Sequence, residues 1–259
     1  MTAGRVLRVF AITWRMHMKM LHRSVFDGVM QVVWPLFFAT AALLIYRVHG
    51  DADALVYAAL GASVMTIWTA ISTTASAVLQ RERGFGTLEL LVAAPAPFPL
   101  SIAAIVSAVS TVGSYGMLAT LVWARLLFGV ELHLGRPLLF AGAVAATVLS
   151  FAVLGFVLCV TVVRYRVAWA LSGLLEYPVW LVCGFLVRTG LLPEWLRPLS
   201  WALPPSWGMA AIRATVEGAN PWRQLALCAG LAVAYGTLGV WLTETILRSA
   251  RKNAALSLS

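Results

Sequence analysis

Long stretches without a charged residue constrain this chain more than any other feature of its sequence. Five such runs, 19 to 35 residues long, lie at 28–46, 54–80, 90–124, 137–163 and 224–243. A helix needs about 20 apolar residues to cross the roughly 30 Å of bilayer hydrocarbon. Only 11% of all residues are charged, against about 25% in an ordinary soluble domain. We therefore expect an integral membrane protein.

The charge-free runs, together with one further apolar run, predict six transmembrane helices. The longest run exceeds one crossing, but Pro95, Pro97 and Pro99 prevent a regular helix in its first part. The stretch 167–187 is interrupted only by Glu176. The predicted fold class is an all-α integral membrane protein with a single transmembrane domain over 1–259. Its spans are expected at 28–46, 54–80, 100–124, 137–163, 167–187 and 224–243.

Two segments outside the spans have their own patterns. In 1–27, basic residues recur at helical spacing on one side, and Val6, Phe10, Met16 and Met20 line another. This pattern predicts an amphipathic interfacial helix, although a plain basic anchor of the first span would look similar.

Segment 188–223 holds four tryptophans, which prefer the membrane interface, and five prolines, which break the segment into pieces too short to cross. We expect short re-entrant helices in the outer leaflet, packed against protein or lining a wet cavity; an extracellular loop with an aromatic belt is the alternative.

The basic residues predict how the chain lies in the membrane. The net charge is +9, from 19 Lys and Arg against 10 Asp and Glu. Placing both termini in the cytoplasm puts twelve of the Lys and Arg inside and seven outside, as the positive-inside rule requires. We therefore expect a multi-pass plasma-membrane protein with both termini cytoplasmic. Because the positions of the basic residues beside the spans explain the excess of positive charge, nucleic acid is not an expected partner.

Several kinds of chemistry are missing from the sequence. The chain has two lysines, Lys19 and Lys252, and neither follows a glycine, so it has no GxxxxGK[ST] phosphate-binding loop. All four histidines lie outside the predicted spans, and the three cysteines lack metal-binding spacing. We expect no catalytic residue, no cofactor and no metal on this chain.

A short cytoplasmic hairpin is predicted at 81–98, between the second and third spans. Gly84 and Gly86 permit a tight turn, Thr87 can cap a short helix, and Glu89 lies where a helix N-terminus favours negative charge. Leucines then share one face of that helix. Leucines exposed to water on a cytoplasmic loop are unfavourable, so we expect another protein to cover them.

The string Arg-Glu-Arg-Gly-x-Gly-Thr-Leu-Glu-x-Leu-x-x-x-Pro at 81–95 resembles the coupling hairpin of type-2 ATP-binding-cassette (ABC) transporter permeases. The stretch 203–218 is similar to the Pro-rich, aromatic segment before their last span, although that family often has an asparagine at the position of Leu203 and an acid at that of Ala210. The resemblance implies two permease copies, identical or paralogous, and two P-loop ATPase subunits that carry ATP and Mg. The implied coupling residues are Arg81, Glu82, Gly84, Gly86, Thr87, Leu88, Glu89 and Leu91.

Glu176 is the only ionisable residue deep in a predicted span. A lone acid there costs roughly 2.5–3.5 kcal/mol on insertion scales, so it should face protein or water. It either lies on the substrate path or at the seam between subunits, as a counter-charge for a cationic amphiphile, or is structural, being protonated or hydrogen-bonded to Tyr177 or to backbone freed by Pro178. Arg188, at a span end, is expected to reach towards lipid headgroups. The candidate path residues are Glu176, Tyr177, Trp201, Trp207 and Arg213.

The expected function is export of a drug-like or lipid-like amphiphile by alternating access, driven by the separate ATPase. A polysaccharide or glycolipid permease of the same family is the nearest alternative. An ATP-independent secondary transporter or a membrane scaffold is the alternative from another class. A secondary transporter should have inverted repeats and several intramembrane charges, and the sequence has neither pattern.

Overall fold

The computed structural model describes residues 3–23, 25–48, 52–75, 77, 84, 86, 97–132, 134–164 and 168–253. Over these residues all regular structure is helical, as the sequence predicts. The elements are α1 (Ala3–Leu21), α2 (Val25–Arg47), α3 (Ala52–Thr69), the π-helix η1 (Ala70–Ala75), α6 (Phe98–Phe128), α7 (Pro137–Arg164), α8 (Ala168–Val182), the 3-10 helix η2 (Thr189–Leu191), α9 (Arg197–Ala202), α10 (Pro204–Val216) and α11 (Trp222–Asn253).

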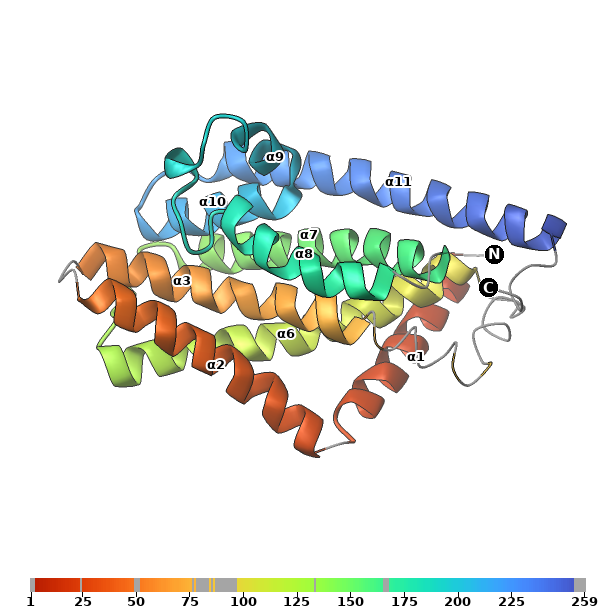
Figure 1. The fold of residues 1–259 in the computed structure, drawn as a ribbon, viewed down its shortest axis with the longest axis horizontal. Helices are drawn as coiled ribbons and strands as arrows, with labels where there is room; N and C mark the ends of the chain where they lie inside the picture. The colour runs from red at the N-terminus through yellow and green to blue at the C-terminus, as the bar shows by residue number, and fades with distance from the viewer. Residues whose placement is uncertain are drawn as a thin grey trace.

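The long helices form an elongated bundle (Figure 1). Helix α1 crosses one end of it and packs against α6, whereas α9 and α10 lie at the other end. We call these the α1 end and the α10 end. The last residues of η1, the first turn of α6 and the C-terminal end of α11 all lie at the α1 end. The segments on either side of the predicted hairpin 81–98 therefore meet the α1 end of the bundle.

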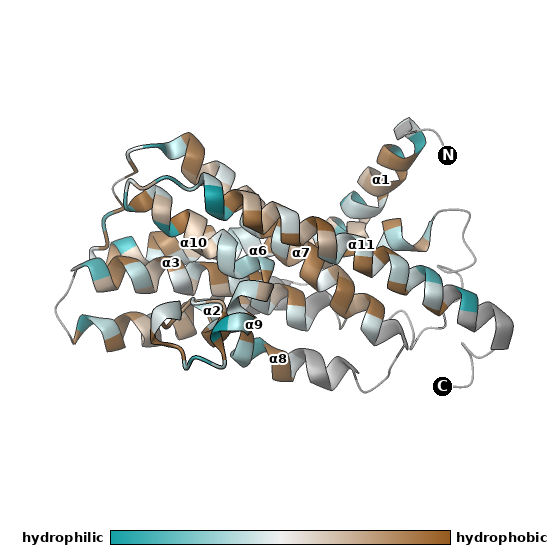
Figure 2. Ribbon diagram, turned by 90° about the horizontal axis from the view of Figure 1, so that it is seen from above, coloured by the Kyte–Doolittle hydropathy of each residue, from teal (hydrophilic) through white to brown (hydrophobic). Residues whose placement is uncertain are grey.

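Within the described part of the chain, four helices are long and apolar enough to cross a membrane: Asp53–Thr73, Phe98–Phe128, Pro137–Thr161 and Trp222–Ile246. They coincide with four of the six predicted spans. The other two predictions fall on α2 and α8, whose apolar stretches, Val33–Arg47 and Gly173–Val182, are shorter. In Figure 2, hydrophobic residues run along the bundle, and hydrophilic ones gather in the connections near α9 and α10 and towards the C-terminal end of α11. The six-span count itself stays a prediction.

At the centre of the hydrophobic core, aromatic rings from α3, α7 and the segment after α8 pack against one another. The rings of Trp68 and Phe151 lie 5.9 Å apart, and those of Phe151 and Phe185 lie 5.8 Å apart. At the crossing of α3 and α6, a Cβ on Gly113 would lie 2.8 Å from the Cα of Ile67. Only glycine permits so close an approach of two helix backbones. Helix α3 is thus held firmly from both sides.

Several helix ends differ from the predicted boundaries. Helix α8 ends at Val182, five residues before the predicted end of that span, because Gly184 adopts a positive φ of 75° and turns the chain. Helices α6 and α11 extend beyond 100–124 and 224–243. Helix α1 packs against α6. Its His17 side chain is buried, whereas Met16 and Met20 of the predicted apolar side are exposed. The two methionines therefore do not lie on the face of α1 that is buried.

Segment 188–223 folds into the short helices η2, α9 and α10. Pro204 and Pro205 begin α10, where the missing N–H groups of proline cost nothing. Met209 and Ile212 on α10 are fully buried, and α10 packs against α7 and α11. The backbone of this non-spanning helix is therefore surrounded by protein.

Candidate functional site

Of the eight predicted coupling residues, the structure describes two. Gly84 and Gly86 are exposed, and Gly86 has a φ of 69°. This left-handed conformation is easy for glycine and costly for residues with a Cβ. The other six lie outside the described residues: Arg81, Glu82, Thr87, Leu88, Glu89 and Leu91.

The Glu176 side chain is buried in the bundle, with 8% of its surface exposed. Its carboxyl group interacts with the hydroxyl of Thr69, at the end of α3. Tyr177 is 56% exposed, so it points away and does not hold the carboxyl group. Helix α3 changes to π geometry at the next residue, Ala70, and α8 packs against that π turn. Glu176 therefore joins α8 to α3.

The two tryptophans of the candidate path bind each other. The Trp207 Nε1 donates a hydrogen bond of 2.9 Å to the backbone oxygen of Trp201. This bond ties α10 to α9. The ring of Trp201 is exposed, as expected for a tryptophan at a membrane interface.

The turn after α8 is held by three side chains from three helices. Its consecutive backbone oxygens, at 184, 185 and 186, each accept one hydrogen bond. Tyr57 of α3 donates to Gly184 at 2.9 Å, Arg213 of α10 donates to Phe185 at 3.2 Å, and Tyr46 of α2 donates to Leu186. We call this arrangement the 184–186 clasp. It fixes the ends of α2, α3, α8 and α10 relative to one another.

Two arginines converge on the ring of Tyr57. The guanidinium carbon of Arg213 lies 3.4 Å from the ring centroid, and that of Arg188 lies 5.4 Å from it. Both distances suit a cation–π interaction. Burial lowers the pKa of the Arg213 guanidinium to about 10, against the opposing effect of Tyr57, so the group keeps its charge at neutral pH. Its Nε is buried and has no hydrogen-bond partner among the described residues.

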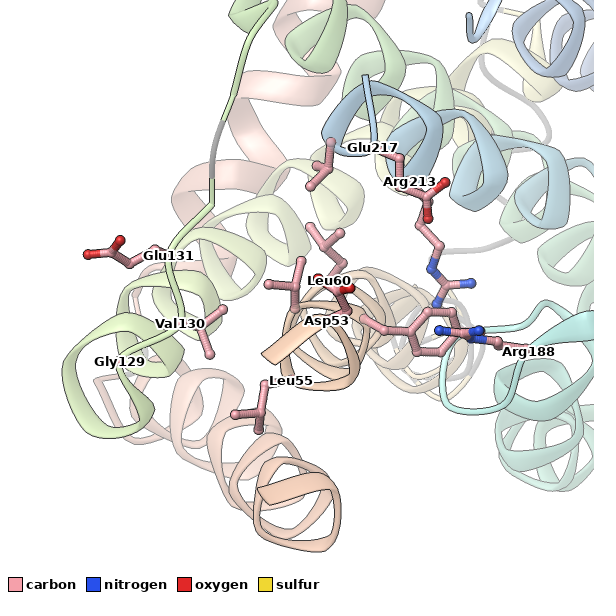
Figure 3. A pocket seen from close by; sticks show the side chains of 12 residues that line it. Asp53, Leu55, Leu60, Gly129, Val130, Glu131, Arg188, Arg213 and Glu217 are labelled. Atoms are coloured by element: carbon pink, nitrogen blue, oxygen red, sulfur yellow. The ribbon is translucent and has the colours of Figure 1, made fainter. Parts of the chain in front are cut away.

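These arginines line an open cleft at the α10 end, with a volume of about 750 Å³ (Figure 3). We call it the α10-end cleft. Its walls come from the first turns of α3, the connection 129–131, Arg188 and the end of α10. Apolar side chains contribute Leu55, Val56, Leu60, Val130 and Val216, and the carboxylates are Asp53, Glu131 and Glu217. The volume lies in the usual range for small-molecule sites.

The structure separates the residues that the sequence grouped as one path. Arg213 lines the cleft, whereas Glu176 touches Thr69. Tyr57 and Thr69 are twelve residues apart on α3, which is about 18 Å along a helix axis. The cleft and the buried acid are therefore two separate places, at different depths of the bundle.

The sequence did not point to the two tyrosines of the clasp or to the contact of Arg188 with Tyr57. Arg188 is exposed, and its guanidinium lies over the ring of Tyr57; its predicted reach towards the headgroups stays a prediction. The partners of Tyr46 and Tyr57 are 140 and 127 residues away in the chain, so no local pattern marks them. One usable signal was available, because both tyrosines lie near span ends on the side predicted to hold Arg213.

Comparison with known proteins gives one family match. Residues 8–216 match the family model described as ABC-2 type transporter, which is more than three quarters of the chain. The matched range starts within α1, ends with the last residue of α10, and includes the predicted hairpin, the 184–186 clasp and nearly all of the cleft. A search of curated proteins found no match.

Proposed function

The chain belongs to the ABC-2 type transporter family, and we propose that this permease exports a drug-like or lipid-like amphiphile from the cytoplasm. Two copies, or one copy and a paralogue, span the membrane, and separate P-loop ATPase subunits supply the energy. The observation that carries the proposal is the family match over residues 8–216. The charge-free spans and the missing phosphate-binding loop agree with a permease that depends on a partner for ATP hydrolysis.

The placement of the elements supports a direction for the mechanism. The segments flanking the hairpin and the crossing helix α1 share one end of the bundle (Figure 1), so the ATPases bind there and that end faces the cytoplasm. The α10-end cleft then opens to the outside. ATP binding closes the ATPase dimer, moves the hairpin 81–98 and α1, and switches the paired spans from inward-open to outward-open.

Helix α3 is the element best placed to transmit this movement. It continues through η1 to Ala75, near the hairpin, and carries Tyr57 of the 184–186 clasp near its other end. Close packing against α6 at Gly113 prevents the two helices from sliding freely. A displacement at the hairpin therefore reaches the cleft through α3 and α6 together.

Co-purification from the native cell tests the proposal. The full-length chain, solubilised in mild detergent, should retain a P-loop ATPase in a 1:1 ratio. A chain that retains no ATPase, and that alone moves an amphiphile along an ion gradient in vesicles, would be a secondary transporter. Stoichiometric recovery of a different cytoplasmic protein, without transport, would instead indicate a scaffold.

A further inference from the structure

One face of helix α1 packs against the bundle, and the opposite face is uncovered. His17 is buried, and Phe10 and Trp14 are half-buried. These positions are four and three residues apart, so they share one side of the helix, and α1 packs with this side against α6. In Figure 2, α1 projects sideways from the other helices. The side opposite His17 is therefore open to another surface.

The uncovered side of α1 is basic. Arg8, Arg15 and Lys19 are exposed and lie seven and four residues apart, which places them on one side of the helix, opposite His17. We call the four exposed basic residues of this helix the α1 basic stripe: Arg5, Arg8, Arg15 and Lys19. Their side chains form no ion pair with any residue in the described part of the chain, and residues 1–26 contain no acid. No carboxylate of the same segment therefore balances this charge.

Exposed apolar side chains accompany the basic ones. Four of them lie on α1: Leu7, Ile12, Met16 and Met20. Ile12 is 59% exposed and lies one turn from both Arg8 and Arg15. At a membrane interface, such apolar side chains enter the acyl region while Lys and Arg extend to the headgroups. The mixture of basic and apolar side chains therefore favours a lipid surface over an acidic protein surface.

The position of α1 along α6 puts the stripe beside the membrane. Helix α6 has 31 residues and is about 46 Å long, whereas the hydrocarbon core is about 30 Å thick. The ring of His22, just after α1, lies 6.2 Å from the ring of Tyr115, which is about 25 Å from the start of α6. Helix α1 therefore runs along the flank of α6 and does not lie beyond its end. Lipid surrounds the flank of a membrane-crossing helix, whereas a soluble ATPase binds beyond the helix ends.

We propose that the α1 basic stripe binds the headgroups of anionic phospholipids in the leaflet at the α1 end. The positive charges attract these headgroups, and the exposed apolar side chains of α1 enter the acyl region beneath them. Each basic residue close to an anionic bilayer raises the affinity about fivefold. The proposal does not rest on the export function. It gives α1, the helix that the proposed mechanism moves, a lipid partner of stated charge.

Quenching by brominated lipid tests which headgroup lies beside the stripe. The full chain with Ile12→Cys, labelled with bimane, is reconstituted in vesicles of equal parts phosphatidylcholine and phosphatidylglycerol. The native cysteines are buried, so the label reports on α1. Either the phosphatidylglycerol or the phosphatidylcholine carries brominated acyl chains, and the two degrees of quenching give the lipid preference. Both leaflets have the same composition, so the orientation of the chain does not affect the result.

Two triple variants with the same loss of charge are compared in the labelled chain. The stripe variant combines Arg8→Gln, Arg15→Gln and Lys19→Gln. The control variant replaces three exposed arginines, in the last turn of α6, just before α7 and in the first turn of α11: Arg125→Gln, Arg136→Gln and Arg223→Gln.

The proposal expects a preference of at least fivefold for phosphatidylglycerol in the unsubstituted stripe. The stripe variant should lower this preference to about one, and the control variant should keep it. Added salt should also lower it, because ions screen the attraction. Equal quenching by both lipids with the stripe intact would overturn the proposal, as would an unchanged preference in the stripe variant. A label that neither lipid quenches and that the bound ATPase shields from iodide would show a protein-binding face instead.

Thermal unfolding in detergent separates lipid binding from folding. The stripe variant should unfold at the wild-type temperature, because the replaced side chains are exposed. The salt dependence of the chain with an intact stripe needs no charge variant, so it tests the proposal even where the stripe variant fails to fold. The measurement needs neither ATPase nor ATP. A negative result therefore removes the lipid contact and leaves the export function standing.

Discussion

Position 61 shows how closely α3 approaches the 184–186 clasp. Gly61 lies one turn after Tyr57, and a Cβ placed on it would come within 1.7 Å of the Phe185 oxygen. That oxygen already accepts the hydrogen bond from Arg213. The backbone of α3 therefore touches the turn directly, and no side chain fits between them.

We predict that Gly61→Ala strongly destabilises the protein, because the clash involves backbone atoms that cannot rotate away. Gly142→Ala is the matched control, since a Cβ there meets nothing within 4 Å. That change should be neutral or should stabilise α7 by up to about 1 kcal/mol, from helix propensity. Thermal unfolding in detergent measures both. A Gly61→Ala variant that unfolds at the wild-type temperature would contradict the packing described for the clasp.

The candidate site was only partly predictable at this scale. An arginine in a Pro-rich, aromatic segment marked Arg213 as functional, and the structure places it in the cleft. The acceptors of the clasp are backbone oxygens of a turn, and backbone oxygens occur at every residue. The sequence places Tyr46 and Tyr57 near span ends on the side predicted to hold Arg213, but it does not identify this turn as their partner.

At the scale of elements, hydrophobic runs located helices better than they located helix ends. The runs at 54–80, 100–124, 137–163 and 224–243 correspond to helices that, among the described residues, are long and apolar enough to cross a membrane. The end of α8 depends on the positive φ of Gly184 and on hydrogen bonds from three other helices. The π geometry of η1 cannot be predicted from the hydropathy of its residues. Long-range contacts decide these features, so the pattern of a single segment could not give them.

The hairpin supports a prediction at the same scale. Truncating Leu88 and Leu91 to alanine together should reduce transport at least tenfold while ATP hydrolysis by the bound ATPase continues. The reason is that each lost leucine removes about 2–5 kcal/mol of packing where the side chain is buried. Leu138→Ala is the control, because Leu138 is 88% exposed in the first turn of α7. Full export by the double variant would show that these leucines do not couple the subunits.

For the whole molecule, the proposed orientation can be tested with thiol labelling. The three native cysteines, Cys159, Cys183 and Cys228, are buried, so an impermeant maleimide reports only on an introduced thiol. On intact cells, we expect labelling of Leu138→Cys, at the α10 end. Arg8→Cys, on the exposed side of α1, should react only after the membrane is permeabilised. Labelling in the reverse order would place the cleft in the cytoplasm.

The central claim is that this chain moves an amphiphile only when a separate ATPase drives it. The most direct measurement is transport of a fluorescent phospholipid in vesicles that contain the chain with its co-purified ATPase. We predict movement that requires ATP and stops when the ATPase is omitted or its P-loop lysine is replaced. Movement at the same rate with the chain alone, without ATP, would contradict the claim.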